Sequence, residues 1–431
     1  MSMFKFFRIF LALCFGSVSA GEPVVNLKTD RPDAIYHLGE TVVFTAELLK
    51  DGAAVPGVKL RWRIARNGDW ERSRETVSGS PLVVKETLRK PGWLALEVSA
   101  VAPGGKAAAR SLTGAMIAPD KIAESAPEPE DFDAFWKKQR SLLNRVPLEA
   151  IRREVDVPPE CRGRVGCWDV QVKCAGAKPV SGYLAMPANA RPGSLPAEVS
   201  FHGAGVHGAH KDLKGGSTHI VFDVNAHGIL NGQPWSYYKA LNEGELKGYR
   251  HAGKRDRDAF YFKEMYLRAM RALDYVKSLP EWDGRTLIVS GVSQGGGQAI
   301  AAAALDPQVT FCLAAVPAMG DHAGQLAGRM PGWPFLVNSR KPGAVDRQVF
   351  EAAKYFDNSC FAKRIRCEVF FAVGFIDFTC SPNSVFAAYN NLPPGTVKHI
   401  QTTPAGGHDA PFGEALARRD EIIRRALKKD F

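Results

Sequence analysis

The feature that most constrains the fold is the stretch Gly291-Val292-Ser293-Gln294-Gly295. An apolar run, Leu287-Ile288-Val289, precedes it, and an alanine-rich segment from Ile300 to Leu305 follows it. A strand, a Gly-x-Ser-x-Gly turn and a helix in that order are typical of a nucleophile elbow, which raises the serine hydroxyl above the sheet. The flanking glycines are needed because a Cβ there would collide with the tight backbone. The stretch therefore predicts that Ser293 is a nucleophile on an α/β sheet.

Strand and helix signals alternate around this turn. Strands are expected at 198–202, 220–224, 287–290, 311–316 and 369–373, with a helix at 257–279 and a last strand that leads through Thr402 to His408. In the helix, apolar residues recur at three- and four-residue steps, so one face is expected to pack on the sheet. Alternating strands and helices imply a mostly parallel sheet that is covered on both faces.

The first 20 residues are typical of a cleavable signal peptide. Lys5 and Arg8 supply a positive start, Ile9 to Phe15 is an apolar core, and Val18-Ser19-Ala20 offers a small-residue cleavage site. The apolar run is well short of the ~20 residues that span a bilayer. We expect a secreted or periplasmic protein with no membrane association beyond this signal.

Residues 21–116 carry short alternating apolar runs that are separated by turn residues. Thr41 to Phe44, Lys59 to Ile64, Leu82 to Val84 and Trp93 to Val98 are expected strands, which favours a small all-β immunoglobulin-like sandwich. We find no catalytic pattern in it and expect an accessory domain. A Pro- and Glu-rich linker at 117–130 and a catalytic domain at 131–431 are expected to follow.

The charge and cysteine content exclude some functions. The formal net charge is +11, and it falls to +9 when the signal peptide with its two basic residues is removed. Basic residues are interspersed with acids, so a nucleic-acid partner is not expected, whereas the net positive charge is compatible with a weak attraction to an acidic polysaccharide. Cys161, Cys167 and Cys174 are close enough in sequence for one disulfide, whereas Cys312 and Cys367 are expected to be buried thiols.

A serine hydroxyl needs an imidazole within hydrogen-bond reach and a carboxylate that orients the imidazole. Downstream of Ser293, His408 in a Gly-Gly-His-Asp loop is favoured over His399, which lies within a strand pattern. Asp377 follows the second strand after the elbow helix and is favoured over Asp321, which follows the first. Either aspartate could instead cap a turn.

The oxyanion of an acyl-transfer reaction needs two N–H donors. The amide of Gln294, which opens the helix after the serine, is expected to supply one, and the amide of Ala204 in the His-Gly-Ala-Gly loop the other. His202, His207 and His210 could suggest a metal site. They lack carboxylates or cysteines at ligand spacing, so no metal and no organic cofactor is expected.

The run from Gly291 to Val309, GVSQGGGQAIAAAALDPQV, resembles the acetylxylan esterase and cephalosporin C deacetylase family, carbohydrate esterase family seven. Other segments agree with it, over about residues 127 to 425: Asp131 to Trp136, Pro196 to Gly203, Tyr355 to Asp357, and Phe371 to Tyr389 with its Asp-x-x-Cys-x-Pro pattern. The resemblance implies an α/β-hydrolase fold with Ser293, Asp377 and His408 as a triad and the Gln294 and Ala204 amides as oxyanion donors.

The chain also departs from this family. Asn225-Ala226-His227 stands where the family usually has Arg-Gly-Gln, Ala204 replaces a common Tyr, and His408-Asp409 replaces a His-Glu pair. Four residues are expected near the substrate, three of them bulky aromatics that could stack on a sugar ring: Trp235, Tyr238, Trp333 and His227.

The resemblance implies a serine esterase that removes acetyl groups from acetylated carbohydrate, such as xylan or its oligosaccharides. Two alternatives remain open: a serine peptidase or broad carboxylesterase of the same fold, and a carbohydrate-binding protein that has lost catalysis. The sequence leaves the oligomeric state open, a homo-oligomer included.

Overall fold

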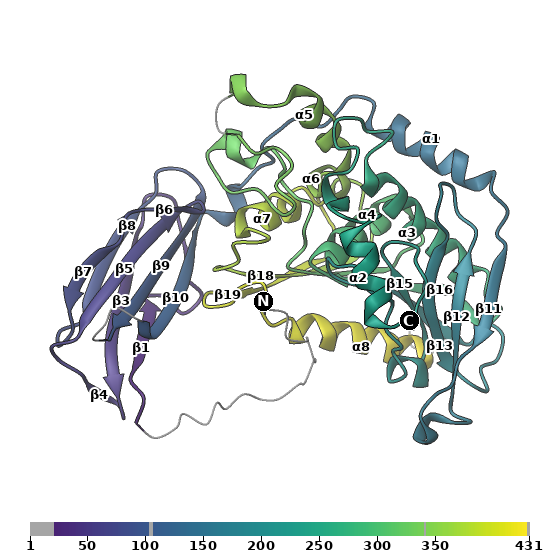
Figure 1. The fold of residues 1–431 in the computed structure, drawn as a ribbon, viewed down its shortest axis with the longest axis horizontal. Helices are drawn as coiled ribbons and strands as arrows, with labels where there is room; N and C mark the ends of the chain where they lie inside the picture. The colour runs from purple at the N-terminus through teal and green to yellow at the C-terminus, as the bar shows by residue number, and fades with distance from the viewer. Residues whose placement is uncertain (1–20, 103–106, 340–341, 429–431) are drawn as a thin grey trace.

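The computed structural model describes residues 21–102, 107–339 and 342–428, which form an N-terminal β domain and a C-terminal α/β domain (Figure 1). The expected signal peptide at 1–20 lies outside the described residues. Within the described parts, no helix combines the length and the apolar character that a membrane span requires.

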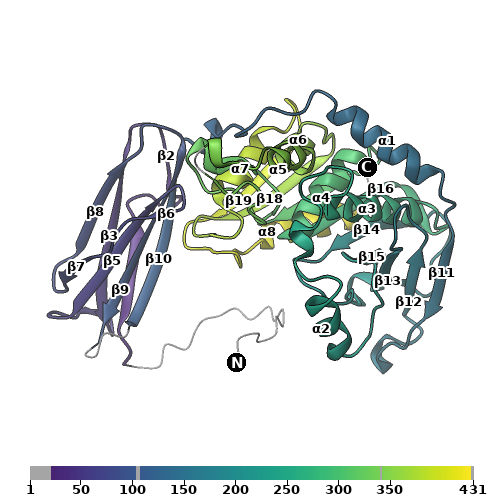
Figure 2. The same ribbon diagram turned by 45° about the horizontal axis from the view of Figure 1, so that its top comes forward.

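The N-terminal β domain, residues 21–117, consists of two antiparallel sheets that pack face to face (Figure 2). The first sheet contains β1 (Val24–Thr29), β3 (Thr41–Lys50), β4 (Ala53–Ala54) and β8 (Leu82–Thr87). The second contains β2 (Ile35–Tyr36), β5 (Lys59–Arg66), β6 (Asp69–Trp70), β7 (Arg74–Val77), β9 (Gly92–Val101) and β10 (Ala107–Ile117), with β2 joined in parallel to β10. Val42, Phe44, Ala46 and Leu48 alternate inward along β3. The four strands expected here from the alternating pattern are all present.

The C-terminal domain is built on one nine-stranded sheet. Its strands in spatial order are β11 (Ala150–Glu154), β12 (Val165–Val172), β13 (Val180–Pro187), β15 (Ile220–Asn225), β14 (Leu195–Phe201), β16 (Trp282–Val292), β17 (Phe311–Ala315), β18 (Glu368–Gly374) and β19 (Lys398–Thr403). From β15 to β19 the pairing is parallel, and from β11 to β15 it is antiparallel. The sheet is therefore mixed, because three strands that the sequence reading left unassigned extend it at one edge.

Helices cover both faces of this sheet. The helices are α1 (Phe132–Asn144), α2 (Trp235–Glu243), α3 (Tyr261–Lys277), α4 (Gln294–Leu305), α5 (Arg347–Ala353), α6 (Asn358–Ala362), α7 (Pro382–Asn390) and α8 (Gly413–Lys428). On β16, Leu287 and Val289 belong to the large core that includes α3 and α4, whereas Ile288 faces the cluster under α8. This alternation is the period of two that a strand covered on both sides requires.

Helix α3 presents the expected apolar face, since Phe262, Tyr266, Met270, Leu273 and Val276 are all buried. It begins four residues later than predicted. The Tyr261 amide donates to the carbonyl of Ala252, which folds the preceding residues into a loop instead of a first helical turn.

The structure shows how the expected linker contacts the C-terminal domain, and it corrects the expectation of a disulfide. The Pro- and Glu-rich segment before α1 is fastened to the C-terminal domain, because Glu124 pairs with Lys363 at 2.9 Å and Glu128 pairs with Arg364 at 2.7 Å. No disulfide joins the three N-terminal cysteines of the C-terminal domain. The described cysteines are all free thiols: Cys161, Cys167, Cys174, Cys312, Cys360, Cys367 and Cys380. Cys312 and Cys367 are buried, as expected.

Candidate active site

Ser293 lies in the sharp turn between β16 and α4. Its φ of 58° and ψ of −119° are unfavourable for a residue with a Cβ, so the surrounding bonds must hold it in place. Its amide donates to Ala315 at 2.9 Å, and its carbonyl accepts from Gly297 and Ala318 at 3.0 and 2.9 Å. A Cβ on Gly295 would overlap the Phe201 carbonyl. Gly295, two residues after Ser293, is therefore required by the end of β14, which packs beside the turn.

The topology brings an acid and a histidine to the same edge of the sheet. Asp377 follows β18 and His408 follows β19, and the carboxyl ends of parallel neighbours point the same way. His408 Nε2 lies 2.9 Å from Ser293 Oγ, and His408 Nδ1 lies 2.8 Å from Asp377 Oδ2. Because a carboxylate can only accept, Nδ1 carries the proton and Nε2 is left to accept from the serine hydroxyl.

Asp377 is fully buried, and its other oxygen is also satisfied. Oδ1 accepts the amides of Thr379 at 2.7 Å and Cys380 at 2.9 Å, so the carboxylate is fixed within its own loop, residues 375–381, the Asp377 loop. The loop of His408 packs against this one, since the Ile376 amide donates to Gly406 at 3.0 Å. These bonds orient the imidazole toward Ser293.

The competing candidates lie elsewhere. Asp321 pairs with Arg329 at 2.7 Å and accepts the Ser125 amide at 2.9 Å, so it anchors the segment before α1. His399 is on β19, where its half-exposed ring stacks on Phe370 with centroids 5.3 Å apart. The geometry brings Asp377 and His408, and not these two residues, to Ser293.

The loop that contains Ala204 lies over the serine. A Cβ on Gly203 would come within 3.8 Å of the Ser293 Cβ, and Gly205 adopts φ 145°, which favours glycine. His202 connects this loop to the residue after β15. Its Nδ1 is 2.6 Å from the Gly203 carbonyl, and its Nε2 accepts the Ala226 amide at 3.1 Å. Desolvation holds the pKa of His202 well below its usual range, so the ring is neutral.

His227 has a different role from the one we expected. It is fully buried, so it is not a substrate contact. Its Nε2 donates to the Gly205 carbonyl at 3.0 Å, and its Nδ1 accepts the Tyr261 hydroxyl at 2.8 Å. Burial lowers the pKa of His227 to about 3, so this ring too is neutral and keeps the tautomer that supports the Ala204 loop.

Tyr249 is a further contact that the sequence reading missed. Its hydroxyl donates to Gln294 Oε1 at 2.7 Å, and its ring meets the His227 ring edge-on with centroids 4.5 Å apart. Gln294 opens α4, so its backbone N–H has no partner within the helix. Tyr249 thus links the two elements that carry the expected oxyanion donors. Tyr249 lies outside every motif of the sequence, so no pattern singled it out.

The three aromatic residues expected near the substrate have different environments. Tyr238 is buried, and its hydroxyl donates to the Leu230 carbonyl at 3.0 Å, so it is a packing residue. Trp235 is 69% exposed at the start of α2. Trp333 is half-buried, its amide donates to the Thr379 carbonyl at 3.0 Å, and it lines a cavity of about 340 Å³. Of the three, Trp333 is therefore the one that the structure ties to the Asp377 loop.

The N-terminal β domain reaches the Asp377 loop directly. The Trp93 indole donates its N–H to the Phe375 carbonyl at 2.5 Å, and the Phe378 ring packs against Trp70 and Trp93 with centroids 5.1 and 4.7 Å apart. A Cβ on Gly114 would overlap the Phe375 carbonyl. The sequence indicated no part for this domain in the site, but three of its strands, β6, β9 and β10, contact the loop that carries Asp377.

The described residues include one group with metal-ligand spacing: Asp377, Cys380 and His408, whose ligand atoms lie within 4.8 Å of one another. Both nitrogens of His408 are already engaged, by Asp377 and by Ser293. The hydrogen-bonded chain from Asp377 to Ser293 accounts for this group without an ion.

Comparison with known proteins places these observations in a family. Residues 120–419 match the acetyl xylan esterase (AXE1) family. The acetyl esterase Axe7A of Xylanibacter ruminicola is 30% identical over 340 residues, which are 77% of this chain and 74% of that protein. Among solved structures, an acetyl xylan esterase from Paenibacillus sp. R4 is 28% identical with a TM-score of 0.60, covering 70% of this chain and 97% of that one. Acetyl xylan esterase 1 from Thermoanaerobacterium sp. JW/SL YS485, 23% identical with a TM-score of 0.58, covers 71% and 97% and shares the α/β-hydrolase fold.

Proposed function

The chain belongs to the acetyl xylan esterase family and is a carboxylic ester hydrolase, and on that premise we propose that it is an exported serine esterase that releases acetate from acetylated carbohydrate. The observation that carries the proposal is the hydrogen-bonded chain from Asp377 through His408 to Ser293, with contacts of 2.8 and 2.9 Å. The relatives are an acetyl esterase and acetyl xylan esterases, which supports acetyl as the acyl group and xylan or its oligosaccharides as the alcohol.

In the first half of the reaction, Ser293 Oγ attacks the carbonyl carbon of the acetyl ester. Its proton moves to His408 Nε2, and Asp377 stabilises the imidazolium that forms. The negative charge on the carbonyl oxygen is held by the amides of Gln294 and Ala204, each of which contributes about 10²- to 10³-fold in rate. As the intermediate collapses, the sugar hydroxyl leaves with the proton from His408, and acetyl-Ser293 remains.

In the second half, His408 takes a proton from water, and the resulting hydroxide attacks the acetyl-serine carbonyl. The same amides hold the second oxyanion. The serine oxygen leaves, recovers its proton from His408, and acetate is released. His408 Nε2 accepts and then releases one proton in each half of the reaction, so the site returns to its starting state.

The proposal also covers the fold and the role of the N-terminal β domain. Two sheets packed face to face support an immunoglobulin-like sandwich, and its contact with the Asp377 loop suggests that it takes part in shaping the site.

The proposal is tested by acetate release over a panel of acetylated xylo-oligosaccharides, simple acetate esters and acyl peptides. Turnover of the acetylated sugars supports it. Dipeptide release with no acetate release would favour a peptidase, and sugar binding without turnover of any ester would favour a binding protein.

A further inference from the structure

Three adjoining hollows run along the surface between the short helix at Tyr249–His251 and α5. Their volumes are about 340, 200 and 590 Å³. Lys254 and Asn338 line both the first and the second, and Arg255 lines both the second and the third. Because neighbouring hollows share walls, we treat them as one trough and call it the basic trough.

Two hydrogen bonds link the near end of the basic trough to the candidate active site. Arg250 and His251 follow Tyr249 in the chain, and the Tyr249 hydroxyl donates to Gln294. On the opposite wall, the Trp333 amide donates to the carbonyl of Thr379, two residues beyond Asp377. Both walls are thus bonded to residues that flank the reacting groups.

The near hollow is cationic. Its lining consists of Arg250, His251, Lys254, Trp333, Pro334, Phe335 and Asn338 and includes no carboxylate. Arg250 is exposed and Lys254 half-buried, and neither has a carboxylate within ion-pairing distance in the part of the chain that the structure describes. Burial and the charges of Lys254 and Arg250 lower the pKa of His251, so its ring is a neutral hydrogen-bonding group beside two cations.

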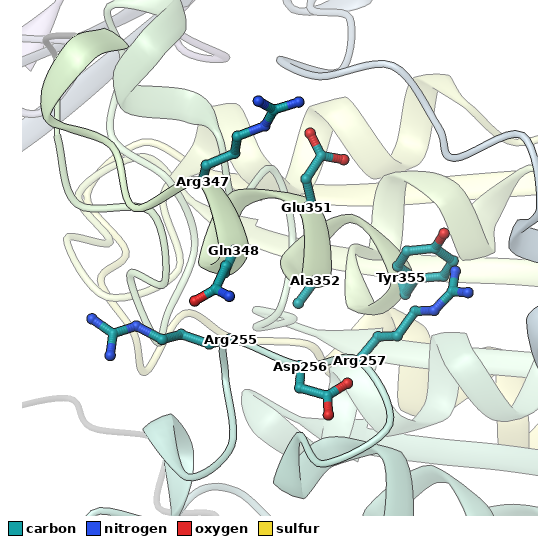
Figure 3. A pocket seen from close by; sticks show the side chains of 8 residues that line it. All are labelled: Arg255, Asp256, Arg257, Arg347, Gln348, Glu351, Ala352 and Tyr355. Atoms are coloured by element: carbon teal, nitrogen blue, oxygen red, sulfur yellow. The ribbon is translucent and has the colours of Figure 1, made fainter.

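The far hollow is lined by both cations and carboxylates (Figure 3). Arg255 pairs with Asp346 at 2.6 Å, and Arg257 pairs with Asp131 at 2.7 Å while its guanidinium lies 4.4 Å from the centre of the Tyr355 ring. Cations that already have carboxylate partners attract a ligand anion weakly. Arg347 also lines the far hollow and has no ion pair among the described residues, but Asp256 and Glu351 line the same hollow. Cations with no carboxylate in the same lining are therefore found at the near end, on Arg250 and Lys254.

An aromatic wall and unpaired cations suit one class of ligand. The apolar face of a sugar ring can pack on Trp333, while a carboxylate on that ring or the next one accepts from Arg250 or Lys254. The hollow falls within the range of about 300–1,000 Å³ that is usual for ligand sites. Neutral glycans would leave both cations without a partner.

We propose that the basic trough binds a uronic acid residue of the acetylated glycan, so that the preferred substrate is an acidic, carboxylate-bearing polysaccharide. The proposal rests on the proposed esterase function of the same site. The net positive charge of the chain would add a long-range attraction to such a polymer.

The test compares two acetylated xylo-oligosaccharides of equal length, one carrying a glucuronic acid branch and one neutral. The measured quantity is the ratio of their kcat/KM values for acetate release. In the wild-type protein we expect a ratio of about five or more at low salt, decreasing toward one at about 0.5 M NaCl as the charges are screened. Arg250→Gln and Lys254→Gln should each lower the ratio by about two- to fivefold.

The matched control is Lys247→Gln, which removes an exposed lysine of the same loop that does not line the trough. It should leave the ratio unchanged. A wild-type ratio of one, or a ratio that Lys247→Gln lowers as much as Arg250→Gln does, would overturn the proposal.

A binding measurement separates this proposal from the esterase function. Ser293→Ala protein is titrated in a calorimeter with deacetylated glucuronoxylo-oligosaccharide and with its neutral counterpart. Tighter binding of the acidic sugar supports the trough even if the wild-type protein releases no acetate, an outcome that would refute the esterase alone. Equal binding of the two sugars would refute the trough whatever the enzyme does.

Discussion

Trp93 offers the most informative perturbation, because it lies in the N-terminal β domain and yet bonds to the loop of Asp377. Trp93→Phe removes the indole N–H and keeps an aromatic ring against Phe378. The Phe375 carbonyl, which accepts at 2.5 Å in the wild-type protein, then loses its partner. An unpaired buried carbonyl costs about 1–3 kcal/mol, and the loop can recover this only by moving the carbonyl toward water.

Asp377 is two residues after Phe375, so this movement of the Phe375 carbonyl also displaces the Asp377 carboxylate from His408. Since 1.4 kcal/mol corresponds to a factor of ten, a cost at the low end of that range predicts a decrease in kcat of about five- to tenfold. KM for a small acetate ester should change little, because Trp93 does not contact Ser293. The assay is steady-state hydrolysis of p-nitrophenyl acetate, with folding monitored by circular dichroism.

Trp62→Phe is the matched control. Trp62 is a half-buried tryptophan of the same domain whose indole N–H has no partner among the described residues, so its loss breaks no hydrogen bond. The decisive comparison uses Asp377→Asn as a background. If Trp93 acts through Asp377, Trp93→Phe should have almost no further effect there. Wild-type kcat in Trp93→Phe, or an equal loss in both backgrounds, would refute the reasoning.

The remaining predictions concern the acid, a buried histidine and the acyl group. Asp377→Asn should lower kcat by about 10³- to 10⁴-fold because the imidazole is held in the wrong tautomer, whereas Asp321→Asn should act on stability; the reverse in ester kinetics would mean that the acid is misassigned. His227 stays neutral down to a pKa of about 3 when folded and titrates near 6.5 when unfolded, so stability is lost as pH falls between those values. The decrease in unfolding free energy from pH 7 to pH 5 should be about 2 kcal/mol smaller in His227→Gln, and an unchanged decrease in urea titrations would contradict the buried neutral ring. Acetate esters should be cut with at least about tenfold higher kcat/KM than octanoate esters, and a p-nitrophenyl series that favours octanoate would exclude a deacetylase.

The sequence predicted those parts of the site that follow from local pattern and chain order. The elbow around Ser293 has glycines whose necessity the structure explains, and the positions of Asp377 and His408 follow from strands that are neighbours and parallel. The four expected strands of the N-terminal domain also follow from simple alternation.

The parts that could not be predicted depend on contacts between distant segments. His227 and Tyr238 were expected at the substrate, but whether such side chains turn outward or into the core depends on Tyr261, Gly205 and Leu230, which the local sequence does not indicate. The bond from Trp93 to Phe375 joins residues 282 positions apart. No periodicity in either segment indicates that partner, which is why the N-terminal domain was expected to stand apart from the site.

The central claim is that Ser293 is the nucleophile of a deacetylase, and the most direct test is acetate release from acetylated xylo-oligosaccharide by the wild-type and Ser293→Ala proteins. The wild-type protein should release acetate, and the folded Ser293→Ala variant should be slower by about 10⁴-fold or more. Wild-type rates in the folded variant, or no acetate release by the wild-type protein from any acetylated sugar, would contradict the account.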